Sequence, residues 1–158
     1  MNSIKKLSLC LIAFTVCLVS CTTVDLYEKT VSMPDHKWHS SNRPSFEFEI
    51  TDTSSYYTVF LVLRHTEKYR FTNIYVNLYV KGPGQDSTIK IQRDLTLATS
   101  EKGWLATGID DIYEHRIPLT TDKQTFKAGR YSFTLEQIMR EDPLEHVLDA
   151  GLRVEKTQ

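Results

Sequence analysis

The feature that most constrains the fold is a period-two alternation of apolar and polar residues. Between residues 46 and 51 the apolar side chains are Phe46, Phe48 and Ile50, and glutamates stand between them. Residues 73–81 repeat the pattern with an aliphatic residue at every second position. Because successive side chains of a β-strand point to opposite faces, this pattern predicts strands with one buried and one solvated face.

Other segments extend the β pattern along the chain. Residues 56–63 are apolar on both faces and rich in β-branched and aromatic side chains, as expected of a central strand. A glycine-rich turn at residues 82–86 leads into a second alternating run at 89–97, which predicts a hairpin with residues 73–81. The remaining expected elements are short strands at 104–107, 131–135 and around 152–155, and single helical turns at 110–114 and 136–141.

These elements define the expected fold class. Seven or eight short strands without a long helix predict an all-β protein, an antiparallel β-sandwich that is Ig-like or jelly-roll-like. The chain has 158 residues, which is enough for a single domain.

The N-terminus has the pattern of an export signal. A basic head at residues 1–6 precedes an uncharged, mostly apolar run at residues 7–19. This run is shorter than the roughly 20 apolar residues that a membrane-spanning helix needs. A basic head before an apolar stretch of this length is typical of a cleavable signal peptide.

The residues at the end of this run resemble the lipobox of bacterial lipoproteins. The resemblance implies that the signal peptidase recognises Leu18, Val19 and Ser20 and cuts before Cys21. The Cys21 thiol would carry a diacylglyceryl group and the new N-terminus would be acylated, and several acyl chains give stable membrane attachment. No run of acidic residues, which would resemble a surface-export signal, follows Cys21. We therefore expect a lipid anchor in the outer membrane, with the domain facing the periplasm.

This interpretation divides the chain into three parts. Residues 1–20 are expected to be the lipoprotein signal peptide, and residues 21–44, which are irregular and polar, a lipidated N-terminus and tether. Residues 45–158 are expected to form the β-sandwich domain.

Charge and cysteine content exclude several functional classes. With 19 basic and 20 acidic residues the net charge is −1, so the chain lacks the basic surface that nucleic-acid binding needs. Cys10 and Cys17 lie in the expected signal peptide and Cys21 would carry lipid. The mature domain is thus expected to have neither a disulfide nor a catalytic thiol.

The sequence offers little for catalysis. His36 and His39 flank Lys37 and Trp38, but zinc takes three or four converging ligands, so we expect no metal site. An acidic cluster within residues 110–114, next to His115, would suit acid–base chemistry of a hydrolase, although solvated turn residues are the simpler interpretation. We therefore expect no catalytic residue and no cofactor.

The aromatic residues suggest a binding face. Tyr75 and Tyr79 fall on the outward side of the alternating strand 73–81. Together with Trp38 they would form a face able to stack on a glycan or contact a partner. The alternative is that another part of the fold covers them.

In order along the chain, Cys21 is followed by the segments 33–38, 46–50, 108–113, 116–118 and 129–156, the last of which includes 139–144 and 149–156. Together these segments resemble the GldH family of gliding-motility lipoproteins from Bacteroidota. The resemblance implies an acylated envelope protein without enzymatic activity, cofactor or catalytic residues. Its implied role is in gliding motility or associated envelope and secretion machinery, through contacts with envelope proteins. A glycan-binding β-sandwich module is the alternative function.

Two of these segments contain candidate partner-binding residues. Asp111, Tyr113, Arg140 and Asp142 would lie in loops, where binding residues tend to occur on a rigid scaffold. Alternatively, Arg140 and Asp142 pin their own turn, while Tyr113 and Leu144 close the end of the core. Both interpretations remain open for the charged residues.

Overall fold

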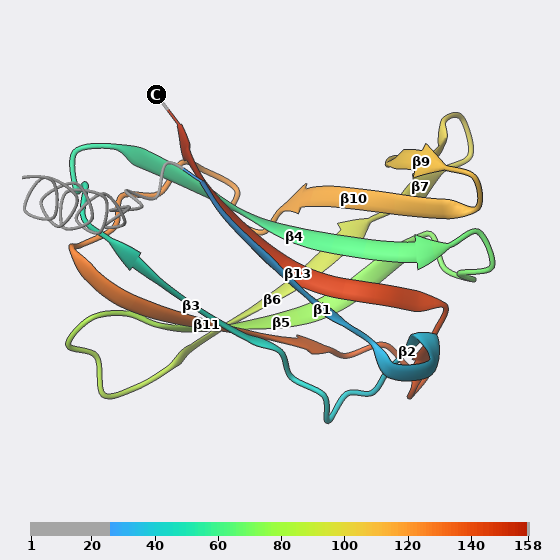
Figure 1. The fold of residues 1–158 in the computed structure, drawn as a ribbon, viewed down its shortest axis with the longest axis horizontal. Coiled ribbons are helices and arrows are strands. Elements are labelled where there is room, and N and C mark those ends of the chain that lie inside the picture. The colour runs from blue at the N-terminus through green and yellow to red at the C-terminus, as the bar shows by residue number, and fades with distance from the viewer. Residues whose placement is uncertain (1–25, 158) are drawn as a thin grey trace, which may run out of the picture.

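Two antiparallel β-sheets pack face to face in the computed structural model, which describes residues 26–157 (Figure 1). The five-stranded sheet has the order β1 (Leu26–Ser32), β13 (Val147–Thr157), β4 (Tyr56–Thr66), β10 (Ile112–Pro118), β9 (Thr107–Ile109). The four-stranded sheet has the order β3 (Ser45–Ile50), β11 (Gly129–Gln137), β5 (Asn73–Lys81), β6 (Ile89–Thr96). Two small sheets pair β2 (Lys37–Trp38) with β12 (Leu144–Glu145) and β7 (Ala98–Thr99) with β8 (Gly103–Trp104), and η2 (Pro34–His36) is a short 3₁₀ turn.

The eight longest strands follow the jelly-roll order. Taken along the chain they are β1, β3, β4, β5, β6, β10, β11 and β13, and every connection except the β5–β6 hairpin crosses between the sheets. The first strand pairs with the last, the second with the seventh, the third with the sixth and the fourth with the fifth. The predicted β-sandwich is confirmed, and this rolled-hairpin order selects the jelly-roll-like alternative.

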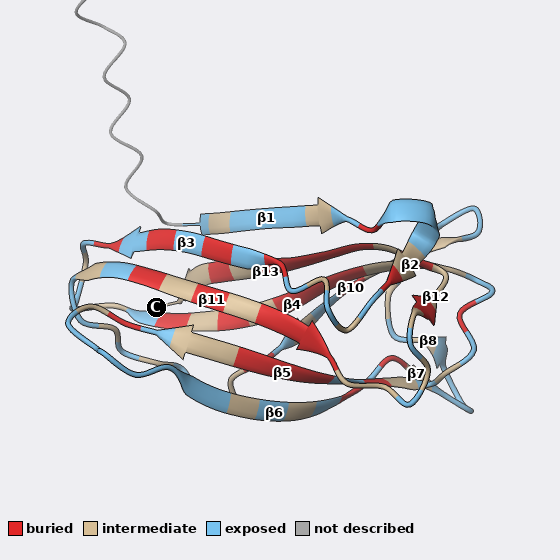
Figure 2. Cartoon of the chain, turned by 90° about the horizontal axis from the view of Figure 1, so that it is seen from below, coloured by how far each residue is buried: buried red, intermediate tan, exposed pale blue. Residues whose placement is uncertain are grey.

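The core lies between the sheets and follows the alternation of the sequence. Figure 2 shows buried residues recurring in bands along β3 and β11. Phe46 and Phe48 of β3 meet Phe133 of β11, and the rings of Phe48 and Phe133 are 5.1 Å apart in an edge-to-face arrangement. Such aromatic packing and the removal of apolar surface from water stabilise the domain.

Several predicted strands match the structure closely. Residues 73–81 are β5, and they form the expected hairpin with β6. The central strand expected at 56–63 is β4, which lies between β13 and β10. None of the helical segments among residues 26–157 has the length and apolar character that crossing a bilayer requires.

The two predicted helical turns were wrong. Residues 107–118 form a β-hairpin, β9 and β10, because the pairing of Ile112–Pro118 with β4 fixes an extended backbone there. The second turn, at 136–141, is replaced by the end of β11 at Gln137 and a loop that leads to β12. In both places pairing with a neighbouring strand outweighs the weak local preference for a helical turn.

The expected tether also needs correction. Residues 21–44 were assigned to a lipidated N-terminus and tether, but β1 pairs with β13 over its whole length, from Leu26 opposite Glu155 to Ser32 opposite Asp149. The sandwich therefore begins at β1 and not at residue 45. The segment looked irregular because in β1 only Tyr27 and Val31 pack against the core.

Candidate functional site

One end of the sandwich, where β4 ends, brings together segments that lie far apart in the sequence (Figure 1). Backbone hydrogen bonds join them. The Met33 N–H donates to the Leu148 carbonyl over 2.8 Å, and the Thr66 N–H donates to the His146 carbonyl over 3.0 Å. The Glu67 N–H donates to the Asp111 carbonyl over 2.8 Å. The ends of β4, the β9–β10 turn and the β12–β13 segment are thus fixed to one another.

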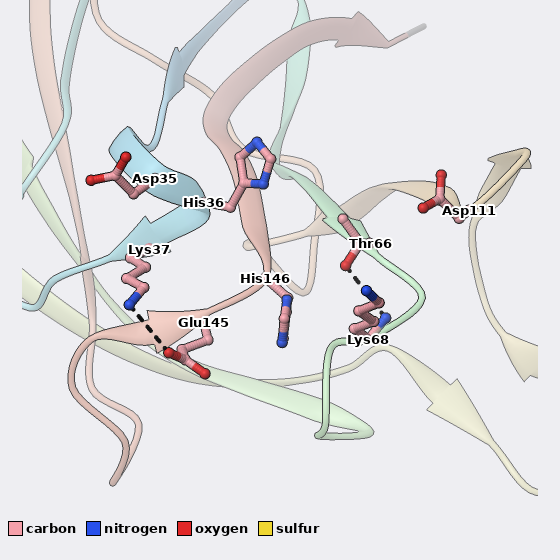
Figure 3. Close-up of a pocket in the computed structure, with 8 residues that line it drawn as sticks. All are labelled: Asp35, His36, Lys37, Thr66, Lys68, Asp111, Glu145 and His146. Carbon is pink, nitrogen blue, oxygen red and sulfur yellow. Dashed lines mark hydrogen bonds and ion pairs between the residues drawn. The ribbon is translucent and has the colours of Figure 1, made fainter.

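A polar pocket of about 320 Å³ opens among these segments (Figure 3). We call it the end pocket. Lys37 and Glu145 form an ion pair across it, with 3.4 Å between Nζ and Oε1. Both side chains are partly exposed, so this pair contributes little to stability and is free to rearrange. The lining residues are Asp35, His36, Lys37, Thr66, Lys68, Asp111, Glu145 and His146.

The backbone around the end pocket is unusual. Asp35, His36 and His146 have φ angles of 54°, 57° and 67°, and Asp110, next to the lining residue Asp111, has 55°. Left-handed backbone is uncommon for residues other than glycine and costs about 1–2 kcal/mol per residue. In residues 26–157 these four are the non-glycine residues with positive φ, and all lie at this end of the sandwich. The surrounding structure therefore holds the side chains of the pocket in a specific arrangement.

A buried histidine pair lies behind the pocket. The Nε2 atoms of His65 and His115 are 2.9 Å apart, and neither side chain is exposed. His65 Nδ1 is 2.8 Å from the Thr66 carbonyl, which can only accept, so Nδ1 carries the His65 proton. His115 then supplies the proton between the two Nε2 atoms. Both rings are neutral in this arrangement.

Aromatic side chains enclose the histidine pair. The His65 ring lies 4.9 Å from Tyr69, 4.4 Å from Trp104 and 5.8 Å from Tyr113, measured between centroids. Burial lowers the pKa of His65. Burial and the neighbouring His65 lower the pKa of His115 to about 4. An apolar enclosure penalises the charged imidazolium, so this cluster is a neutral part of the core at neutral pH.

The structure separates the candidate partner-binding residues. Asp111 lines the end pocket and is exposed, whereas Tyr113 packs against His65 and Trp104 and closes this end of the core. Asp142 accepts hydrogen bonds from the N–H and the hydroxyl of Ser40, over 2.9 and 2.6 Å. These bonds lower the pKa of Asp142 and pin its loop to the segment after β2.

Arg140 lies elsewhere, at a shallow hollow of about 470 Å³ that also includes Tyr75. This hollow is on the outer side of the four-stranded sheet, and Arg140 is exposed there. The four predicted residues therefore do not form a single loop site.

The expected aromatic face does not form as a unit. Trp38 is fully buried and its Nε1–H donates to the Asn42 carbonyl over 2.8 Å, because β2 pairs with β12 and closes the core. Tyr75 and Tyr79 do lie on the outer side of β5, and Tyr75 is 38% exposed. The Tyr79 hydroxyl donates to Glu136 over 2.6 Å, so its polar end is occupied within the sheet.

The acidic cluster beside His115 is also dispersed. Along β10 the side chains alternate, so His115 points into the core and Glu114 points to the outer face, where it pairs with Arg64 and Arg116. Asp110 and Asp111 lie in the β9–β10 turn. The carboxylates and the imidazole therefore do not face a common substrate position. In the part of the chain that the structure describes, no three histidine, cysteine or acidic residues are placed to hold a metal ion.

The lipidation residues Leu18, Val19, Ser20 and Cys21 lie outside the described residues. Among the pocket residues, the sequence singled out Asp111 but not Thr66, Lys68 or His146. Thr66 ends β4, Lys68 lies in the turn after it, and His146 has left-handed backbone between β12 and β13. None of these positions carries a glycine or another signal in the sequence.

Comparison with known proteins decides the family. The model of the GldH lipoprotein family matches residues 25–154. The chain belongs to the GldH lipoprotein family. This is a family of gliding-motility lipoproteins, and its name denotes no enzymatic activity. A lipoprotein of this kind is anchored to a membrane of the cell envelope.

Two GldH relatives cover nearly the whole chain. A gliding motility lipoprotein GldH homolog of Christiangramia forsetii is 28% identical over 153 residues, covering 91% of this chain and 92% of the relative. The gliding motility lipoprotein GldH of Flavobacterium johnsoniae is 24% identical over 160 residues, covering 97% and 98%. Among solved structures, a family 28 carbohydrate-binding module specific for non-crystalline cellulose has a TM-score of 0.43 and 11% identity, over 83% of this chain and 73% of that chain.

The end pocket lies where segments with GldH resemblance meet. The segments 33–38, 108–113 and 139–144 all reach this end of the sandwich. Trp38 pairs with Leu144 between β2 and β12, and Ser40 bonds to Asp142.

Proposed function

We propose that this chain is a non-catalytic lipoprotein, anchored through Cys21 in the outer membrane and facing the periplasm. It acts in gliding motility or in associated envelope and secretion machinery, through contacts with envelope proteins made at the end pocket. The family supports the general role. The observation that carries the assignment of the contact site is the left-handed backbone of non-glycine residues, which within residues 26–157 occurs at this end of the sandwich.

The chemistry of the end pocket suits a polar protein contact. Its rim offers carboxylates, imidazoles and the Lys68 ammonium within one opening, and Lys37 and Glu145 can exchange their mutual ion pair for a partner's charges. Backbone strain persists where the surrounding structure enforces it, and it clusters at functional sites. Loops held on a rigid scaffold are common sites of recognition.

Site-specific crosslinking in living cells tests this proposal. A photo-crosslinking residue in place of Lys68, at the end pocket, is compared with one in place of Glu47, an exposed position on the outer side of β3. We expect Lys68 to yield a discrete envelope-protein product that the Glu47 position does not yield. The same products from both positions, or none from Lys68, would contradict the contact site.

Charge reversal provides the matched control. Asp111→Lys changes the charge of the pocket rim without touching the core, and it should weaken the Lys68 product. Glu47→Lys makes the same change in charge on the sheet face and should leave the product unchanged. Equal effects of both substitutions would show that net charge, and not the pocket, governs the contact.

A further inference from the structure

The end of the sandwich opposite the end pocket is where the described chain begins. β1 starts at Leu26, opposite Glu155 near the end of β13, and runs toward η2 and the end pocket (Figure 2). The turns at 51–55, 82–88 and 119–128 lie at the same end as the start of β1 (Figure 1). We call this the starting end.

The length of chain before β1 limits how far the starting end can lie from an anchor at Cys21. Residues 21 and 26 are separated by five Cα–Cα steps, which span at most about 18 Å when fully extended. β4 has 11 residues and is therefore about 36 Å long. An anchor at Cys21 thus holds the starting end close to the membrane, while the end pocket lies a strand length away.

The starting end carries exposed apolar side chains suited to a lipid surface. Leu26 and Ile89 are each 50% exposed and Tyr56 is 48% exposed. Leu26 and Tyr56 lie on the same outer side of their sheet, since their neighbours Tyr27 and Tyr57 point into the core. Tyrosine and aliphatic side chains of this kind favour the boundary between headgroups and acyl chains.

Basic side chains at the starting end make a smaller contribution to membrane contact. Lys81, Lys127 and Arg130 are exposed at this end and can approach lipid phosphates. Asp86 and Asp122 lie at the same end, so no strong positive field results.

At the other end of the sandwich Ile109 and Leu105 are 75% and 42% exposed, so apolar exposure alone does not distinguish the two ends. The short tether therefore carries the argument, and the apolar side chains of the starting end provide the contact.

We propose that the starting end rests on the phospholipid headgroup layer and that the end pocket points away from the membrane. This inference rests on the proposed lipidation of Cys21. In this orientation the end pocket remains accessible although the tether is short, because the length of the strands separates the pocket from the membrane.

Energy transfer to labelled lipid tests the orientation. The acylated chain carries a donor dye on Asp86→Cys, in the turn at the starting end, or on Glu101→Cys, in the turn between β7 and β8. The two turns are separated by the eight residues of β6, about 26 Å. Vesicles of phosphatidylethanolamine and phosphatidylglycerol carry an acceptor on a fraction of headgroups. We expect severalfold stronger transfer from Asp86→Cys, and equal or reversed transfer would overturn the orientation.

Flotation of the same samples separates the two proposals. A chain that does not float with the vesicles overturns both the lipid anchor and the orientation. A chain that floats but shows equal transfer from both positions overturns the orientation alone.

A double substitution tests the apolar contact. Leu26→Ser with Tyr56→Ser changes two outward-facing side chains, so it should leave folding and flotation intact while reducing the difference in transfer. An undiminished difference would show that these side chains do not contact the lipid.

Discussion

At the residue scale, the buried histidine pair is the clearest departure from an ordinary hydrophobic core. His65 and His115 satisfy each other through one shared proton. His115 Nδ1 makes no hydrogen bond of good geometry, although the Leu105 backbone is close enough to raise the pKa of His115 slightly against the effect of burial. An unpaired buried polar atom of this kind costs about 1–3 kcal/mol. The pair is therefore a weak point that depends on both rings remaining neutral.

This arrangement predicts acid sensitivity. In the unfolded chain a histidine takes up its proton near pH 6.5, whereas burial lowers the pKa of His65 and lowers that of His115 to about 4. Between these values the unfolded chain binds more protons, so the free energy of unfolding falls as the pH drops from 6.5 toward 4. The loss from His115 is at most about 3 kcal/mol.

Urea denaturation at pH values from 7 to 4 measures this effect. His115→Gln keeps a hydrogen-bonding group near His65 and should flatten the pH dependence in this window. The exposed His39→Gln is the control and should retain the fall in the free energy of unfolding between pH 6.5 and 4. An unaltered pH dependence of the free energy of unfolding in His115→Gln would show that the buried histidine pair is not the source of the acid sensitivity.

At the element scale, β1 depends on one glycine. A Cβ added at Gly151 of β13 would lie 2.5 Å from the Lys29 carbonyl oxygen and 2.6 Å from Thr30 Cγ2, so β1 would have to move. Ion pairs reinforce the contact: Glu28 of β1 bonds to Arg153 over 2.7 Å and to Arg116 over 3.1 Å. These pairs are partly exposed and contribute modestly.

Gly151→Ala should therefore loosen β1 selectively. We expect a loss of about 1–3 kcal/mol in the free energy of unfolding, in the range of overpacked core substitutions. Hydrogen exchange should show faster exchange of β1 amides than of β5 amides. Ser132→Ala, on the other sheet, should leave β1 protected. Full protection of β1 in Gly151→Ala would show that the close contact of Gly151 with Lys29 and Thr30 does not determine the stability of β1.

The elements also show which parts of the fold can be predicted from the sequence. β5 was predicted to the residue because its inward positions are aliphatic without interruption. β10 was missed because an inward position is His115, which breaks the apolar alternation that identifies a strand. The end pocket was not predicted, because it forms from strand ends brought together by the jelly-roll order, and residues such as His146 adopt left-handed backbone without a glycine.

At the scale of the whole molecule, the jelly roll links the two ends of the protein. The sandwich places the start of β1 at one end and the end pocket at the other. The proposed sites of attachment and recognition are therefore separated by the length of the strands. The GldH family supports an envelope lipoprotein. Everything about its position relative to the membrane depends on a lipid at Cys21.

Intact-mass spectrometry of the chain isolated from its own membranes tests most directly whether Cys21 carries a lipid. We expect a chain that begins at Cys21 and carries the added mass of a diacylglyceryl group and an N-terminal acyl group. A chain that retains residues 1–20, with an unmodified cysteine and recovered from the soluble fraction, would contradict the lipid anchor.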